Sequence, residues 1–123
     1  MEYIGVHHVS LVVTELERAK HFYSNILGFN LIKRPNFDTE GAWYQIGNTQ
    51  LHLIVYRKGK TFRGTTDLDR DDGHFAVQVE DIDAFIRHIK TLGVELLTVS
   101  NKEAGGERVY VSDPDGNLIE FKS

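Results

Sequence analysis

Residues 7–31 read HHVSLVVTELERAKHFYSNILGFNL, and residues 73–96 read GHFAVQVEDIDAFIRHIKTLGVEL. Both stretches contain a histidine, alternating apolar residues, an acidic turn, apolar residues at helical spacing and a Leu-Gly pair. Alternation with a period of two predicts a strand, and apolar residues three and four apart predict an amphipathic helix. The chain that follows also repeats, because residues 41–56 match residues 106–123 apart from an insertion at residues 113–116. The sequence therefore predicts two similar βαβββ modules of the α+β class.

The repeat also sets the predicted boundaries within the chain. The first module covers about residues 1–56 and the second about residues 73–123, within a single domain of residues 1–123. A chain of this length forms one domain and buries a sizeable core without disulfides. The linker, residues 57–72, carries five basic and four acidic residues. It is predicted to be a solvated loop, with a flap over a binding site as the alternative.

Each module is expected to contain one helix and four strands. Thr14 is predicted to cap the first helix, with Glu17 at capping-box spacing, and Gly28 to end it. The second helix begins near Ile82 and stops at Gly93. The remaining periodic segments are predicted to be strands. These strands cover residues 6–13, 29–33, 42–46, 50–56, 74–79, 95–99, 108–112 and 118–122.

Strand alternation separates a face under the helix from an opposite face, here called the open face. In the first strand the apolar positions 9, 11 and 13 belong under the helix, which leaves His8 and Ser10 on the open face. The same alternation places His52, His74 and Glu120 on the open faces of their strands. By repeat position, His8 corresponds to His74 and His52 to Glu120. Three imidazoles and a carboxylate suit a divalent first-row metal ion.

Simpler interpretations exist for each of these residues alone. A single strand histidine is more often structural than a ligand, and Glu120 could be a solvated residue near the chain end. His7, His21 and His88 are not expected to be ligands. The coincidence of ligand types at four matched positions nevertheless favours a metal site.

Composition excludes several functional classes. The formal charge is −4, the pI is near 5.8 and no Lys/Arg-rich cluster is present, which argues against nucleic-acid binding. The chain has no cysteine, so thiolate metal sites and thiol nucleophiles are excluded. The N-terminus does not resemble a signal peptide, and no apolar run could span a bilayer. We therefore expect a cytoplasmic protein with a small-molecule substrate and no membrane partner.

The sequence resembles the vicinal oxygen chelate superfamily, also called the glyoxalase/bleomycin resistance/dioxygenase superfamily. The resemblance covers nearly the whole chain and rests on residues 7–29, on GHFAVQVEDIDAF at residues 73–85 and on VYVSDPDGNLIEF at residues 109–121. It implies two βαβββ modules forming a curved eight-stranded cup around a metal ion. It also implies that cups are often completed across a homodimer.

The resemblance further implies specific ligands. His8, His74 and Glu120 match the superfamily's two-His-one-carboxylate set, and His52 occupies its further ligand position. Glyoxalase I enzymes carry a glutamate where this chain has His52, which puts lactoylglutathione lyase activity in doubt. Bleomycin-resistance proteins lack the metal ligands that this chain retains.

The predicted function is a metal-dependent glyoxalase-like enzyme of the lyase or isomerase type. The metal (Zn, Ni, Mn, Co or Fe(II)) would chelate neighbouring oxygens of the substrate, with Glu120 as the candidate general base. The candidate substrate contacts on the open face are Ser10, Gln78, Arg108 and Tyr110. Trp43 and Tyr56 are expected either to line the site or to pack in the core. The alternatives are a small-molecule binding or sequestering protein, and a thiol transferase or single-domain dioxygenase of the same superfamily.

Overall fold

The computed structural model describes every residue except 60, 62, 102 and 104, two of which lie in the predicted linker. The chain divides into two compact units, Met1–Lys60 and Thr61–Ser123, and each is described by itself. The first unit contains β1 (His8–Val13), α1 (Leu16–Lys20), η1 (His21–Ile26), β2 (Asn30–Ile32), β3 (Gly41–Ile46) and β4 (Thr49–Val55). The second contains β5 (Phe75–Gln78), α2 (Ile82–Thr91), β6 (Leu97–Asn101), β7 (Gly106–Ser112) and β8 (Leu118–Lys122).

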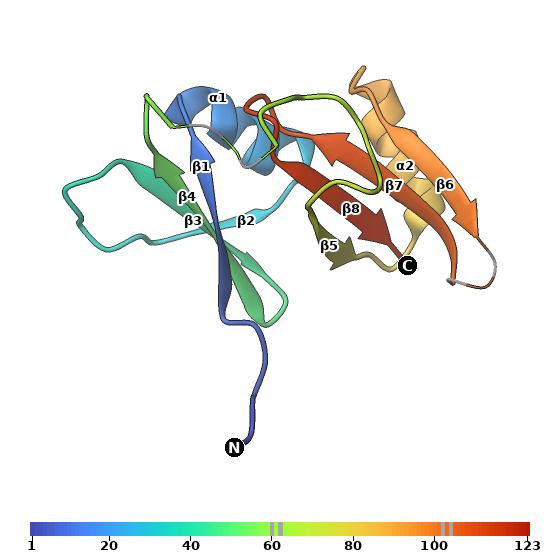
Figure 1. Cartoon of the computed structure of the whole chain (residues 1–123), viewed down its shortest axis with the longest axis horizontal. Helices are drawn as coiled ribbons and strands as arrows, with labels where there is room; N and C mark the ends of the chain where they lie inside the picture. The colour runs from blue at the N-terminus through green and yellow to red at the C-terminus, as the bar shows by residue number, and fades with distance from the viewer. Residues whose placement is uncertain (60, 62, 102, 104) are drawn as a thin grey trace. The chain divides into compact units, whose positions relative to one another are not determined.

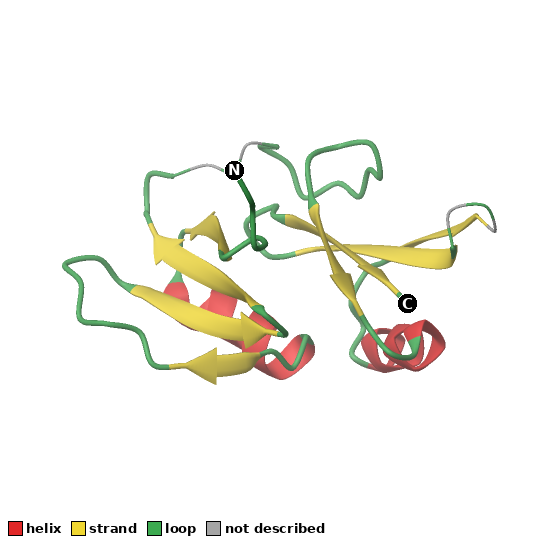
Figure 2. Cartoon of the chain, turned by 90° about the horizontal axis from the view of Figure 1, so that it is seen from below, coloured by secondary structure: helices red, strands yellow, loops and turns green. Residues whose placement is uncertain are grey.

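Each unit is a four-stranded mixed sheet with its helix on one face (Figures 1 and 2). The strand orders are β1-β4-β3-β2 and β5-β8-β7-β6, so the two units repeat one topology. In each unit the first and last strands pair in parallel, and the other neighbours pair antiparallel. A parallel pair needs a crossover connection, which the helix and the two middle strands provide. The predicted α+β fold of two βαβββ modules is confirmed.

The core of the first unit lies between its sheet and its helical segment. Strand residues Val13, Tyr44, Leu51 and Leu53 are buried there. Phe22 and Tyr23 from the helical segment are also buried. The Tyr44 and Ser24 hydroxyl oxygens lie 2.8 Å apart, so the buried phenol has a hydrogen-bond partner. This arrangement agrees with the predicted helix-side face of the sheet.

The second core repeats this arrangement with different side chains. α2 buries Ile82, Ile86 and Ile89 against its sheet. The rings of Phe85 and Phe121 stack with their centroids 4.2 Å apart. Since Phe121 lies under the helix, its neighbour Glu120 points to the open face.

The first helix differs from the prediction at its start and in its middle. The capping box predicted at Thr14 is wrong: Glu15 is the N-cap residue, and its side chain makes no capping hydrogen bond. The Thr14 hydroxyl instead accepts a hydrogen bond from Arg18 at 3.0 Å. From His21 the helix widens into η1, a π-helix in which the Leu27 N–H bonds the Phe22 carbonyl at 2.9 Å. This wider turn holds the adjacent Phe22 and Tyr23 side chains in the core.

Two loops pack together in the second unit beside the start of β8. In the turn before β8, the Asp113 carboxylate accepts hydrogen bonds from the Asp115 and Asn117 N–H groups and from the Asn117 amide. Asp113 is only 1 % exposed, so these bonds satisfy a buried carboxylate. Part of the predicted linker packs on this turn, because Arg63 donates to the Gly116 carbonyl at 3.0 Å. Among the described residues, no helix has both the length and the apolar character that a membrane span requires.

Candidate functional site

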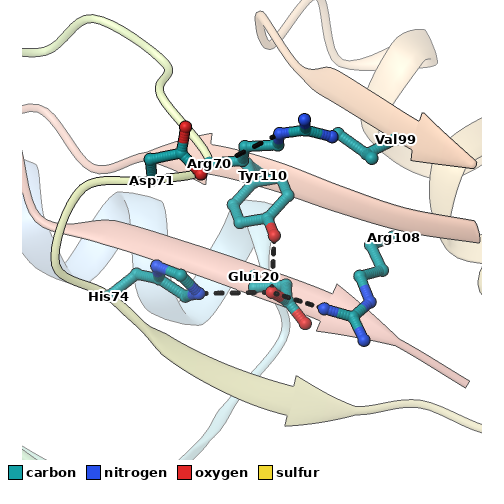
Figure 3. Close-up of a pocket in the computed structure, with 7 residues that line it drawn as sticks. All are labelled: Arg70, Asp71, His74, Val99, Arg108, Tyr110 and Glu120. Carbon is teal, nitrogen blue, oxygen red and sulfur yellow. Dashed lines mark hydrogen bonds and ion pairs between the residues drawn. The ribbon is translucent and has the colours of Figure 1, made fainter. Parts of the chain in front are cut away.

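Glu120 lies at the centre of a polar cluster on the open face of the second sheet. Its side chain enters this face from β8, directly opposite Tyr110 on β7 in the strand register. The Tyr110 hydroxyl donates to Glu120 Oε1 at 2.7 Å, and His74 Nε2 lies 3.2 Å from the same oxygen. Arg108 Nη1 lies 3.8 Å from it (Figure 3). Although Glu120 is only 4 % exposed, the Tyr110 hydrogen bond and the Arg108 charge compensate its carboxylate.

His74 reaches Glu120 from the segment just before β5. Its Nδ1 atom lies 2.7 Å from the Asp72 carbonyl oxygen. A carbonyl only accepts hydrogen bonds, so Nδ1 carries the proton, and in the neutral ring Nε2 carries the lone pair. A backbone partner of this kind commonly orients a metal-binding histidine. His74 thus presents a ligand nitrogen beside a carboxylate oxygen.

Asp72 is itself held in place by Arg63. The Arg63 guanidinium donates to the Asp72 carboxylate at 2.9 Å and also to the Asp67 carbonyl oxygen. The Arg63 side chain is only 4 % exposed. The hydrogen bond from Arg63, followed by one from the Gly73 N–H, lowers the pKa of the Asp72 carboxyl. The loop that carries His74 is therefore anchored by a buried arginine rather than being wholly solvated.

A hollow of about 260 Å³ opens over this cluster. It is lined by Arg70, Asp71, His74, Val99, Arg108, Tyr110 and Glu120 (Figure 3). Burial, and then the hydrogen bond to Glu120, raise the pKa of the Tyr110 phenol. Tyr110 consequently remains a hydrogen-bond donor at neutral pH. The hollow combines two carboxylates and an imidazole with two cationic side chains, one of which, Arg70, lies 4.0 Å from the Asp71 carboxylate.

The first unit contributes a stack of three rings on its own open face. The His52 ring lies between Trp43, with centroids 3.9 Å apart, and His8, with centroids 4.1 Å apart. The angles between the ring planes are 3° and 14°. His52 Nε2 also lies 2.8 Å from the side-chain oxygen of Gln50.

Burial makes His52 a neutral ring. It is 7 % exposed, whereas His8 is exposed. Burial lowers the pKa of His52, and the neighbouring His8, His7 and Arg34 charges act in the same direction. Because the ordinary pKa of histidine is about 6.5, His52 is neutral at physiological pH.

Of the other residues predicted for the site, Ser10, Gln78 and Tyr56 make none of these contacts. Ser10 is exposed on β1 and pairs with His52 in the strand register. Gln78 is exposed at the end of β5 and does not line the hollow. Tyr56 is exposed, while Trp43 is part of the ring stack rather than the core.

The four predicted metal ligands fall into two pairs, with His8 and His52 in the first unit and His74 and Glu120 in the second. Within the described part of the chain, no three histidine, aspartate or glutamate side chains form a group that could hold a metal ion.

The sequence interpretation missed Arg63, Arg70 and Asp71. All three belong to the charged linker, where nothing in the pattern distinguishes a buried arginine from a solvated one.

Comparison with known proteins identifies the family of this fold and site. The family profile described as the Glyoxalase/Bleomycin resistance protein/Dioxygenase superfamily matches residues 5–121. A protein named lactoylglutathione lyase from Neisseria meningitidis is 30% identical over 93% of this chain and 86% of its own length. Fosfomycin resistance protein FosX from Listeria innocua is 28% identical over 95% of this chain and 87% of its own length.

Solved structures agree with this assignment. The structure titled putative glyoxalase family protein from Bacillus anthracis has a TM-score of 0.79 and 28% identity, and the match covers 100% of this chain and 98% of that one. A second structure is FosX from Listeria monocytogenes, complexed with Mn(II) and 1S,2S-dihydroxypropylphosphonic acid. It has a TM-score of 0.73 and 23% identity, and the match covers 98% of this chain and 92% of that one. At this identity the likeness supports the fold alone. The chain belongs to the glyoxalase/bleomycin resistance protein/dioxygenase superfamily.

Proposed function

We propose that this chain is a metal-dependent enzyme that acts on a small substrate with two neighbouring oxygen atoms. The observation that carries the proposal is the contact between His74 and Glu120. The Asp72 carbonyl sets the tautomer that frees His74 Nε2, and that nitrogen lies 3.2 Å from Glu120 Oε1. A neutral imidazole and a carboxylate side by side are a donor set that suits divalent first-row metals. These residues therefore fit a metal ion.

In this proposal His74 and Glu120 would hold the ion together with an imidazole from the His8–His52 pair. A bound divalent ion would act as a Lewis acid on the chelated oxygens of the substrate. The identity of the ion, among Zn, Ni, Mn, Co and Fe(II), is a matter for direct metal analysis.

The other residues of the hollow have distinct roles in the proposed chemistry. Glu120 is the candidate base, and its Oε1 atom faces Tyr110, His74 and Arg108. The hydrogen bond from Tyr110 occupies Oε1, so proton transfer is assigned to Oε2. Arg108 and Arg70 line the hollow and would attract an anionic group of the substrate. Ser10 and Gln78 remain candidate substrate contacts.

The relatives supply two candidate reaction types. One is the lyase or isomerase type, as in the relatives named lactoylglutathione lyase, and the other is resistance chemistry of the FosX type. A protein that binds a small molecule without reacting is the alternative from a different class. We also propose a cytoplasmic homodimer.

Metal analysis of the purified protein tests the proposal. Wild-type protein, stripped with a chelator and reloaded, should bind about one divalent ion per chain. Replacement of His8, His74 and Glu120 together by alanine should abolish this binding, because it removes the proposed donors. The matched control replaces His21 and His88, which lie on the helices, and should keep full occupancy. Stoichiometric metal in the triple variant would contradict the proposal.

A further inference from the structure

The ring stack of the first unit constrains how its two histidines can bind a metal ion. The β3–β4 register places Trp43 opposite His52, and the β1–β4 register places Ser10 beside His52. His8 lies two residues before Ser10 and therefore on the same face of the sheet. The three rings consequently lie face to face, with His52 in the middle.

This parallel arrangement prevents His8 and His52 from sharing one ion. A metal bound to an imidazole nitrogen lies close to the plane of that ring, at about 2.1 Å from the nitrogen. The two ring planes are inclined by only 14°, and the centroids are 4.1 Å apart. Planes so nearly parallel meet only far beyond the length of a metal–nitrogen bond. While the stack persists, one ring of the pair can be a ligand and the other cannot.

Burial and contacts distinguish the two rings. His52 is covered on one face by Trp43 and on the other by His8, and its Nε2 atom is engaged by Gln50. His8 is exposed at the start of β1. His8 Nδ1 lies 2.8 Å from His7 Nδ1, so one of these two nitrogens donates to the other. When His8 is the donor, its Nε2 atom carries the lone pair that a metal requires.

We propose that His8 is the metal ligand of the first unit and that His52 is a positioning residue, which with Trp43 forms an aromatic platform for the His8 ring. This assignment rests on the proposed function. It leaves the first unit with one metal ligand rather than two. The coordination positions not taken by protein are then available to two neighbouring oxygens of the substrate. His52, which stands where glyoxalase I enzymes carry a glutamate ligand, thereby positions the His8 ring without binding the metal itself.

Zinc affinity of matched variants tests the assignment, measured by competition with a colorimetric chelator. His52→Phe keeps a ring in the stack but removes both nitrogens, so its affinity should stay within about threefold of wild type. His52→Ala removes the platform as well and should weaken binding about tenfold, as loss of an orienting partner commonly does. His8→Phe removes a ligand and should weaken binding by about a hundredfold or more. Circular dichroism and thermal unfolding establish that each variant is folded.

A second measurement needs no variant. Nitrogen NMR of the histidine rings, recorded for wild-type protein with and without Zn²⁺, identifies metal-bound nitrogens directly. The His8 and His74 rings should each acquire one metal-bound nitrogen, while the His52 ring, recognised by its contact with the Trp43 indole, should acquire none.

The contrary outcomes are distinct. Two results would overturn the platform and leave the proposed function standing. One is a metal-bound nitrogen on His52. The other is a folded His52→Phe variant that loses as much zinc affinity as His8→Phe does. Failure of the wild-type protein to bind Zn²⁺ or any of the other proposed ions would overturn the proposed function, and the platform with it.

Discussion

Tyr44 is a residue whose ionisation opposes folding. Its phenol is buried beside the Ser24 hydroxyl, at 2.8 Å. Burial raises the pKa of Tyr44, the hydrogen bond with Ser24 opposes this effect, and the Glu17 charge adds to it. The unfolded chain, with an ordinary tyrosine pKa of about 10, therefore loses this proton first as the pH rises.

The stability contributed by Tyr44 protonation should be fully present below about pH 10 and should be lost as the pH rises toward its raised pKa in the folded state. Tyr44→Phe should remove this part of the alkaline loss. The measurement is the free energy of unfolding in urea at a series of pH values for both proteins. If the free energy of unfolding falls equally steeply with rising pH in both proteins, folding does not raise the pKa of the Tyr44 phenol. Ser24→Ala in the Tyr44→Phe background controls for the hydroxyl left without its partner.

At the scale of single residues, the sequence predicts which face a side chain occupies but not what it contacts. Alternation along β4 separates Leu51 and Leu53 from His52 without any long-range information. The stack of His52 on Trp43 depends on the register between β3 and β4, which one sequence does not specify. The contact between His74 and Glu120 likewise depends on the pairing of β5 with β8.

At the scale of elements, the turn before β8 packs against the loop that carries Arg63 and Thr65. A Cβ atom on Gly116 would lie 2.4 Å from the Thr65 carbonyl oxygen, and the backbone φ of Gly116 is +95°. Both features exclude side chains, the first by contact and the second by conformation. Only the presence of a turn at this place was predictable, because the loop that packs on it is distant in sequence.

Gly116→Ala should destabilise the protein by about 3 kcal/mol, since backbone strain and the contact with Thr65 act together. Gly105→Ala is the matched control, because φ is +94° there and, among the described residues, the one atom within 4 Å is the Lys122 Nζ, at 3.7 Å. Gly105→Ala should lower the free energy of unfolding by about 1 kcal/mol, because only the backbone conformation there opposes the alanine. Thermal or urea unfolding gives both values. Equal losses would mean that the loop moves away from the turn at little cost.

The first helix shows why element boundaries are harder to predict than elements. The apolar spacing that indicates a helix is present from Leu16 to Ile26, and the glycine stop at Gly28 has φ of +72°. The widening at His21 is a tertiary effect, because it serves to bury adjacent aromatic rings. Local propensity contains no signal for it.

At the scale of the whole molecule, each unit has its own core, and the proposed ligands are divided between them. The segment before β1 exposes Met1, Tyr3, Ile4 and Val6. Apolar side chains gathered in one exposed segment are typical of an interface. Together with the family resemblance, this segment supports the proposed homodimer.

Sedimentation equilibrium at micromolar concentration should give twice the chain mass of 14.0 kDa. Replacing Tyr3 and Ile4 by serine should shift the protein toward the monomer, because it removes apolar area from the proposed interface. Replacing the exposed Leu92 by serine is the control and should leave the mass unchanged. A 14.0 kDa wild-type monomer that binds metal would show that one chain completes its own site.

Trp43 gives the protein an optical property that follows from its place in the stack. It is the single tryptophan of the chain, so tryptophan emission reports on one ring only. That ring lies face to face with His52, at 3.9 Å. Any compound that disturbs the platform should therefore change the intensity or colour of the emission. Unlabelled protein can accordingly be screened against libraries of small oxygenated anions by fluorescence, before any reaction has been identified.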